Sequence, residues 1–527
     1  MASKAEAAAG KGLRSSMSRT GRALSGASVL LLQGVVSTVT PFVVAPILVH
    51  FDGQAALGGF AIVTQILSYV LLLDLGITQA LGRELARLAH RADCTDTRDQ
   101  TVVTGVLLLL VIGVAAAVAL YAVALSLPLW LHDSPKTSQG LRAALVAFAW
   151  WMPVRFALTI APTLLYSSQA IAKFGAISLC SDIGRALATL GAIASGFGLL
   201  GIAIAWIGAE ALTLVASTVV ARKSLACINW RSRPRPEVIR RLVRVGMPLG
   251  LMSLADRLTF YSQSIIVGAL FDAKVAAAFY ASRAPGNGGM ALVWRLTDAT
   301  VPALNDLHAR GALAEAAFRS AFLRLSSYAV GLSLWLGVAL LVLNGPFVNG
   351  WLGKALYLGP LMTMSIAALA PIAGLKNILT KFLVVGGSVS WYPWVLLLEG
   401  ALNVGLSVLL GLRLGPSGVM LATVLAHVVS IPYLIHKVTT LGSVAPLSWI
   451  RQTMARAARC SALGIVTVLL AFALARPVSA WGIVTVGVSS LVAGSMGFLF
   501  LGLAPVDRAS FLELAGRWVS WLPRARR

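Results

Sequence analysis

Apolar runs of 18 or more residues recur from one end of this chain to the other, and they constrain its fold more than any other feature. An α-helix needs a run of about this length to cross the hydrocarbon core of a bilayer. Only 12% of the residues are charged, which is about half of what a soluble protein carries. The sequence therefore predicts an all-α polytopic membrane protein.

We predict fourteen transmembrane helices from these runs. They cover residues 27–49, 55–81, 101–127, 143–166, 174–196, 199–221, 245–270, 275–304, 320–343, 358–385, 391–412, 417–437, 460–476 and 480–503. Lys and Arg collect in the cytoplasmic loops of membrane proteins. With the N-terminus inside, only six of the 43 Lys and Arg residues fall in outer segments: Lys136, Arg142, Lys274, Lys354, Arg413 and Arg476. Both termini are therefore predicted to be cytoplasmic, and the net charge of +24 follows from topology rather than from nucleic-acid binding.

The chain contains an internal repeat. Residues 174–215 and 391–429 each form two apolar runs joined by a short turn, with one acid in the first run. A shift of 217 residues places Asp182 on Glu399, Gly198 on Gly415, and Gly201 on Gly418. A second pair of stretches agrees at a shift of 219, which places Phe60 on Phe279, Thr78 on Thr297, and Arg91 on Arg310. Weak internal symmetry of this kind is typical of transporter folds.

The repeat predicts the domain organisation. Each copy holds six predicted helices, an even number, so the two copies have the same orientation and their symmetry axis runs along the membrane normal. We expect two six-helix lobes facing each other across a central cavity, with two extra helices packed outside. The predicted divisions are a basic cytoplasmic tail (1–26), an N-lobe (27–222), a cytoplasmic linker (223–244), a C-lobe (245–440), helices 13 and 14 (within 441–503), and a second cytoplasmic tail (504–527).

Many ionisable residues lie inside the predicted spans. They are Asp74, Arg155, Asp182, Arg185, Glu210, Asp256, Arg257, Arg283, Arg295, Asp298, Lys376, Lys381, Glu399 and His427. A charge near the membrane centre costs about 2.5–3.5 kcal/mol on insertion scales, so most of these residues must line a hydrated cavity or pair with one another. Spacing predicts a pair between Asp182 and Arg185, which share one helical face. Glu399 and His427 are candidates for a contact between two helices.

The remaining intramembrane arginines are predicted anion ligands, because a guanidinium group binds phosphate oxygens in pairs. We assign substrate binding to Arg257 and Arg283, helped by Arg155 and Arg295. The acids Asp74, Glu210 and Glu399 are candidates for coupling transport to protons or sodium. The segment 285–289 (Pro-Gly-Asn-Gly-Gly) predicts a broken or bent helix directly after Arg283, with a hinge or a close-packing site as the alternatives.

Neither a metal site nor a cofactor site is predicted. The four cysteines, Cys94, Cys180, Cys227 and Cys460, are far apart and lack the spacing of zinc ligands or of a disulfide framework. No phosphate-binding loop is visible, and no predicted external loop is long enough to form a catalytic domain. We therefore expect a transporter and not an enzyme.

Several short motifs resemble those of the polysaccharide (Wzx-type) flippases, in the multidrug/oligosaccharidyl-lipid/polysaccharide exporter superfamily. Their order and spacing carry the resemblance, which extends over essentially the whole chain. The motifs are Leu73-Asp74-Leu75-Gly76 followed by Arg83, Glu84, Leu85 and Ala86; Pro248; Ile266-Val267-Gly268; Tyr280; Pro302; Trp351-Leu352-Gly353; and Glu399, Asn403, Ser407, Gly415 and Gly418.

The resemblance implies alternating access between two lobes in the bacterial inner (plasma) membrane. It implies a polyprenyl-pyrophosphate-linked oligosaccharide as substrate, moved to the outer leaflet for cell-surface polysaccharide (O-antigen, capsule or exopolysaccharide) synthesis. Implied partners are membrane lipids and the polysaccharide polymerase machinery. Alternatives are a peptidoglycan-precursor flippase, a MATE-like drug or cation antiporter, and a membrane glycosyltransferase or polymerase on the same carrier. Peptidoglycan-precursor flippases carry arginine in helix 1, where this chain offers only Gln33.

Overall fold

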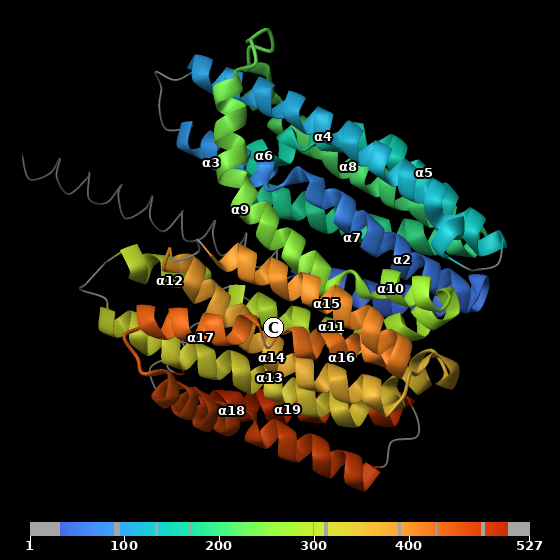
Figure 1. The fold of residues 1–527 in the computed structure, drawn as a ribbon, viewed down its shortest axis with the longest axis vertical. Coiled ribbons are helices and arrows are strands. Elements are labelled where there is room, and N and C mark those ends of the chain that lie inside the picture. The colour runs from blue at the N-terminus through green and yellow to red at the C-terminus, as the bar shows by residue number, and fades with distance from the viewer. Residues whose placement is uncertain are drawn as a thin grey trace, which may run out of the picture. The chain divides into compact units, whose positions relative to one another are not determined.

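The protein is built from α-helices (Figure 1). The computed structural model describes residues 32–88, 95–131, 135–168, 170–298, 300–309, 315–387, 391–427, 429–475, 480–503 and 508. Every regular element in these ranges is a helix, which confirms the predicted fold class. The predicted tails, apart from Arg508, and the matched pair Arg91 and Arg310 lie outside the described residues.

Twelve helices in the described ranges are long and apolar enough to cross a membrane. They account for twelve of the fourteen predicted spans. The other two, 245–270 and 275–304, are also helical but contain more charged residues and are interrupted at Tyr261–Ser262 and near residue 300. Their crossing of the membrane stays a prediction.

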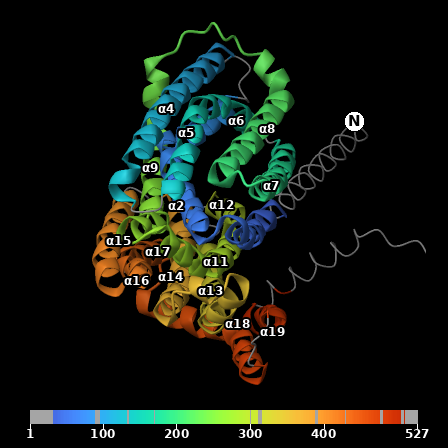
Figure 2. The ribbon, with the colours of Figure 1, turned by 90° about the vertical axis from the view of Figure 1, so that its right-hand side faces the viewer.

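The described chain divides into two compact units, residues 1–277 and 278–527. The first unit begins with a helix at Leu32–Asp52. It continues with α2 (Gln54–Val70), the 3-10 helix η1 (Leu71–Asp74), α3 (Ile77–Leu88), α4 (Thr95–Trp130), α5 (Pro135–Leu158), α6 (Ile160–Ser167), α7 (Ile171–Ala194), α8 (Gly198–Ala226), α9 (Pro236–Phe260) and α10 (Gln263–Leu270). Helices α4 and α5 run side by side, as do α7 and α8 (Figures 1 and 2).

Helices α9 and α10, predicted as the start of the second lobe, pack within the first unit. The Gln65 side chain of α2 accepts a hydrogen bond from the Ser264 backbone N–H and donates one to the Ser264 hydroxyl, both at 2.8 Å. It therefore satisfies a backbone donor in the first turn of α10 that has no partner inside the helix. The Tyr69 hydroxyl donates to the Arg257 carbonyl oxygen at 3.0 Å. The predicted lobe boundaries themselves stay a prediction.

The predicted linker is fixed against the start of α4 (Figure 2). The Asn229 backbone N–H donates to Asp99 Oδ2 at 3.0 Å, and the Arg235 backbone N–H donates to Thr104 Oγ1 at 3.1 Å. These bonds satisfy two backbone donors of the linker. The segment between α8 and α9 is therefore held against α4 by two hydrogen bonds.

The second unit contains most of α11 (Ala273–Asp298) and the rest of the described chain. Its further helices are α12 (Val301–Ala309), α13 (Glu315–Trp351), η4 (Lys354–Leu356), α14 (Pro360–Val385), α15 (Tyr392–Leu414), α16 (Pro416–Ala426), α17 (Ser430–Leu441), α18 (Pro446–Ala475), α19 (Ala480–Gly497) and the π-helix η5 (Phe498–Gly502). Helix α13 packs along α14 and also along α18 (Figure 1).

The two matched hairpins have the same local design. Helices α7 and α8 pack as one hairpin and α15 and α16 as the other. Their matched turn glycines, Gly198 and Gly415, both have positive φ, +56° and +70°. Only glycine adopts this conformation readily. The glycines matched in the following helix are also crowded: a Cβ would lie 2.4 Å from Phe197 Cβ at Gly201 and 2.1 Å from the Leu410 carbonyl oxygen at Gly418. The predicted repeat is thus visible in the backbone at these hairpins.

Helix α11 is continuous, so the predicted break at residues 285–289 is wrong. Transmembrane helices tolerate proline because neighbouring groups satisfy the freed backbone atoms. The glycines there serve close packing, which was one of the alternatives. A Cβ would lie 2.4 Å from Ile366 Cγ2 at Gly286 and 2.5 Å from Leu336 Cδ1 at Gly289.

The last two helices are joined to α13 through Trp335. Its indole N–H donates to the Ser490 hydroxyl of α19 at 3.0 Å. A Cβ at Gly464 of α18 would lie 2.8 Å from the indole ring, and one at Gly494 of α19 would lie 2.9 Å from it. Trp335 therefore packs directly against the backbone of both added helices.

Candidate functional site

Arg155 and Glu210 form an ion pair between α5 and α8. Arg155 Nε lies 2.6 Å from Glu210 Oε1, and the Trp151 indole N–H donates to Glu210 Oε2 at 2.9 Å. The sequence analysis gave Arg155 and Glu210 separate roles, as anion ligand and coupling acid. The structure brings them together, so each already balances the charge of the other.

A second ion pair lies on α7. Arg185 Nη2 is 2.7 Å from Asp182 Oδ1, as the three-residue spacing predicted. Gln33 of the first helix donates to Asp182 Oδ2 at 3.1 Å. The Arg185 guanidinium also lies 5.3 Å from the ring centroid of Trp206. The expected pair is confirmed, and Gln33 is an additional partner that links two helices.

Asp74 caps the helix that follows it. Its Oδ1 accepts hydrogen bonds from the backbone N–H and the hydroxyl of Thr78, both at 3.0 Å. Between them, Leu75 and Gly76 have φ values of +47° and +72°, which turn the chain sharply into α3. An acidic N-terminal cap of this kind satisfies backbone donors and favours the helix dipole. Asp74 therefore has a structural role in the Asp-Leu-Gly motif, and its role in coupling stays a prediction.

The same turn packs against glycines of α9. A Cβ at Gly246 would lie 2.9 Å from the Leu75 carbonyl oxygen, and one at Gly250 would lie 2.7 Å from the Leu75 carbonyl carbon. Farther along α3, Glu84 Oε1 bonds Arg241 of α9 at 2.8 Å and Arg87 at 2.6 Å. The guanidinium groups of Arg87 and Arg241 hold the pKa of Glu84 below its ordinary value. Helices α3 and α9 are thus joined by backbone contact and by charge.

Arg257 of α9 differs from these paired arginines. Its guanidinium carbon lies 4.2 Å from the ring centroid of Tyr261 and the side chain is half-buried. Among the described residues of the first unit, no carboxylate lies within ion-pair distance of it. A guanidinium that stacks on a ring keeps its N–H donors for another ligand.

The other predicted anion ligands belong to α11 in the second unit. The Arg283 residue is only 8% exposed, and Arg295 is half-buried. At the end of this helix, Asp298 Oδ1 lies 2.5 Å from Lys381 Nζ. Arg283 thus places a charge in a buried environment, where a polar partner is required. The substrate-binding roles of these arginines stay predictions.

Glu399 lies at the centre of a buried cluster in the second unit. Its Oε1 is 2.5 Å from Lys376 Nζ of α14 and 3.7 Å from His427 Nδ1 at the end of α16. The Lys376 and Glu399 side chains are 8% and 0% exposed. The expected contact between Glu399 and His427 is present, and Lys376 is the stronger partner that the sequence did not identify. Glu399 therefore ties three helices together.

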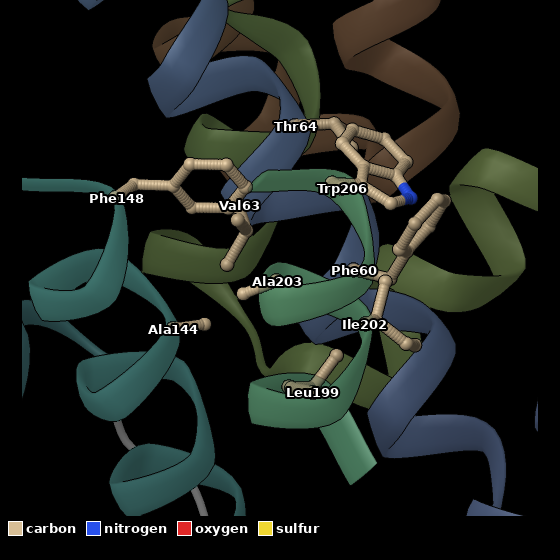
Figure 3. Close-up of a pocket in the computed structure, with 9 residues that line it drawn as sticks. All are labelled: Phe60, Val63, Thr64, Ala144, Phe148, Leu199, Ile202, Ala203 and Trp206. Atoms are coloured by element: carbon tan, nitrogen blue, oxygen red, sulfur yellow. The ribbon is translucent and has the colours of Figure 1, made fainter. Parts of the chain in front are cut away.

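Within the described residues, no group of three or more His, Cys, Asp or Glu side chains is placed to hold a metal ion. Cys180 and Cys227 are exposed thiols and Cys460 is a buried one, while Cys94 lies outside the described residues. A small hollow in the first unit is lined almost wholly by apolar side chains, including Phe60, Phe148 and Trp206 (Figure 3). It lacks the polar groups that would orient a charged ligand.

The fold and the apolar spans define a multi-pass membrane protein. The family model described as "Polysaccharide biosynthesis protein" matches residues 23–308, more than half of the chain, and the chain belongs to this family. The expected resemblance is thereby confirmed.

Solved structures share the fold at low sequence identity. The lipid II flippase MurJ in an inward closed conformation is 12% identical, has a TM-score of 0.66, and covers 92% of this chain and 99% of its own. An inward-facing multidrug resistance MATE family transporter of the MOP superfamily is 16% identical, has a TM-score of 0.59, and covers 80% of this chain and 99% of its own. An outward-facing MATE structure is 17% identical, with a TM-score of 0.53 and coverages of 80% and 96%. No curated protein matches the chain.

Proposed function

We propose that this protein is a flippase for a polyprenyl-pyrophosphate-linked oligosaccharide in the bacterial inner membrane. It would move this lipid from the cytoplasmic to the outer leaflet for cell-surface polysaccharide synthesis, without chemical change and with both termini in the cytoplasm. The observation that carries the proposal is membership of a polysaccharide biosynthesis family by a chain with the MATE and MurJ fold. Charged residues within its spans support a polar substrate.

In this proposal the pyrophosphate binds to arginine side chains, with Arg257 and Arg283 as the main ligands. The stacked guanidinium of Arg257 supports this assignment. Arg295 assists, whereas the pairing of Arg155 with Glu210 assigns Arg155 a smaller part than the sequence analysis gave it. Outward movement of negative charge down an inside-negative potential releases about 2.3 kcal/mol per charge per 100 mV. This energy drives transport without ATP.

Deletion of the protein tests the proposal. Completed lipid-linked repeat units are expected to accumulate on the cytoplasmic leaflet, measured as labelled glycan accessible to a glycosidase in inverted but not in right-side-out membrane vesicles. Accumulation on the outer leaflet, or elongation of the glycan by the purified protein, would instead assign a polymerase or glycosyltransferase. Accumulation of peptidoglycan precursor would assign the second candidate, which the fold shared with the lipid II flippase favours.

The anion ligands make a separate prediction. Arg257→Ala and Arg283→Ala are each expected to weaken binding of polyprenyl pyrophosphate by roughly 10–100-fold, because a charge-assisted hydrogen bond contributes about 1.5–3 kcal/mol. Binding is measured with purified protein in nanodiscs. Arg413→Ala, at an exposed position in the last turn of α15, is the matched control and should bind normally.

Insertion and folding of each variant are checked by its elution as a single species and by its thermal stability. Arg257→Lys and Arg283→Lys retain the charge and are expected to bind better than the alanine variants but less tightly than the native protein. Full glycan export by both alanine variants would show that the anion site lies elsewhere.

A further inference from the structure

Six polar residues of the first unit form what we call the paired-charge patch. They are Gln33, Trp151, Arg155, Asp182, Arg185 and Glu210, from the first helix, α5, α7 and α8. The patch consists of two ion pairs, each with one further hydrogen-bond donor on its carboxylate. The proposed transport of a lipid-linked glycan does not yet use it.

The two ion pairs are neighbours along the hairpin of α7 and α8. Helices α7 and α8 run antiparallel, and two cross-links give their register: Trp206 donates to Thr189 at 3.1 Å, and Ser181 donates to the Ala209 carbonyl at 3.0 Å. Arg185 lies over the Trp206 ring, and Glu210 follows Trp206 by four residues, one turn along the same face of α8. The two pairs therefore lie about one helical turn apart along α8.

These partly exposed charges are not expected to face lipid. The Arg185 side chain is 41% exposed and Glu210 is 33% exposed, although both lie within apolar spans, Lys173–Ala194 and Gly198–Ala226. Ionised side chains inside spans face water-filled cavities or polar partners. The patch is thus available to a hydrated or polar ligand.

The net charge of the paired-charge patch indicates which class of ligand it binds. Two guanidinium groups and two carboxylates give the patch no net charge, so it does not attract an anion. Each guanidinium has five N–H donors and each carboxylate about four acceptor positions, and the bonds within the patch use only some of them. The patch therefore presents guanidinium donors next to carboxylate acceptors. This arrangement suits hydroxyl groups, because a hydroxyl group both donates and accepts hydrogen bonds. The rings of Trp151 and Trp206 beside the pairs add apolar surface for the C–H face of a sugar.

We propose that the paired-charge patch binds the uncharged sugar residues of the transported glycan. This inference rests on the proposed flippase function and adds a subsite separate from Arg257 and Arg283, the main ligands assigned to the pyrophosphate. It predicts that the protein recognises the sugars themselves, so binding depends on the glycan as well as on the lipid carrier. Because the patch is neutral, this recognition changes little with salt concentration.

The test compares two probes on the full-length protein in nanodiscs. One is the lipid-linked repeat unit purified from the deletion strain. The other is synthetic polyprenyl pyrophosphate of the same chain length, without sugar. The native protein is expected to bind the glycosylated probe roughly tenfold or more tightly, because a few hydrogen bonds are added. The Asp182→Leu/Arg185→Leu double variant should lose this preference while binding polyprenyl pyrophosphate as before.

The control is Asp298→Leu/Lys381→Leu, which removes an exposed ion pair outside the patch and also preserves the net charge. It should retain the preference for sugar. Arg185→Lys keeps a cation beside Asp182 but removes the planar fork, so at least a threefold loss of preference is expected even if the leucine variant does not fold.

The outcomes separate the two proposals. If the native protein binds both probes equally, or if Arg185→Lys and a folded leucine variant keep the full preference, the sugar subsite is refuted and the flippase proposal stands. If the native protein binds neither probe, or if no repeat unit accumulates in the deletion strain, the flippase proposal itself has failed.

Discussion

Replacement of Lys376 by methionine is expected to destabilise the protein by about 3–5 kcal/mol, because it leaves the Glu399 carboxylate buried without its cation. Glu399 is wholly buried, and Lys376 Nζ lies 2.5 Å from its Oε1. Methionine has nearly the same length as the lysine stem, so loss of packing contributes little. The stability is measured by denaturation of the purified protein in detergent, followed by intrinsic tryptophan fluorescence.

Two further variants isolate this effect. Lys381→Met removes a lysine from the half-exposed pair with Asp298 and should cost less than about 1 kcal/mol. The double variant Lys376→Met/Glu399→Leu removes both buried charges and should recover most of the loss, because replacing a buried pair by apolar residues is often neutral. A Lys376→Met loss no larger than that of Lys381→Met would show that the buried pair contributes little.

The second large effect concerns Gly250. The Gly250→Ala variant is expected to lose about 1–3 kcal/mol, the usual cost of forcing an extra group into a packed site. Its new Cβ would lie 2.7–2.8 Å from three backbone atoms of Leu75, which no side-chain rotation can relieve. Because this contact holds the Asp-Leu-Gly turn against α9, glycan export should fall with stability. Both are measured on the same variant, by denaturation and by export in cells.

Gly208 provides the matched control, since it is also helical but a Cβ there meets nothing within 4 Å. Alanine is favoured over glycine in helices by about 1 kcal/mol, so Gly208→Ala should be neutral or stabilising. The two substitutions are chemically identical and are expected to have opposite signs. A Gly250→Ala protein as stable and active as Gly208→Ala would show that the turn does not depend on this contact.

Sequence patterns predicted the helices, the contacts within one helix and the contact between Glu399 and His427, but not the other partners between helices. Asp182 and Arg185 are three residues apart, and helical geometry alone brings them together. Arg155 and Glu210 come from different helices, as do Lys376 and Glu399. Whether such residues meet depends on the rotation and depth of each helix, and these are set by packing. The hairpin turns were predictable because glycine at positive φ is a local signal.

In the segment after Arg283, the sequence predicted a feature that the structure does not have. Proline and three glycines within five residues indicate a break in a soluble protein, but α11 continues through them. In this chain the glycines bring α11 close to Ile366 of α14 and Leu336 of α13. Composition alone does not show whether glycines interrupt a helix or allow a neighbouring helix to pack closely against it.

The position of Trp335 determines where this chain can be shortened. Removal of everything after α17 would take away Ser490, the acceptor of the indole N–H, and both glycines on which the ring rests. A large aromatic side chain of α13 would then lose its contacts on one side. Although the last two helices lie outside the duplicated sequence, they complete the interior of the second unit. A shortened protein therefore has to keep both α18 and α19.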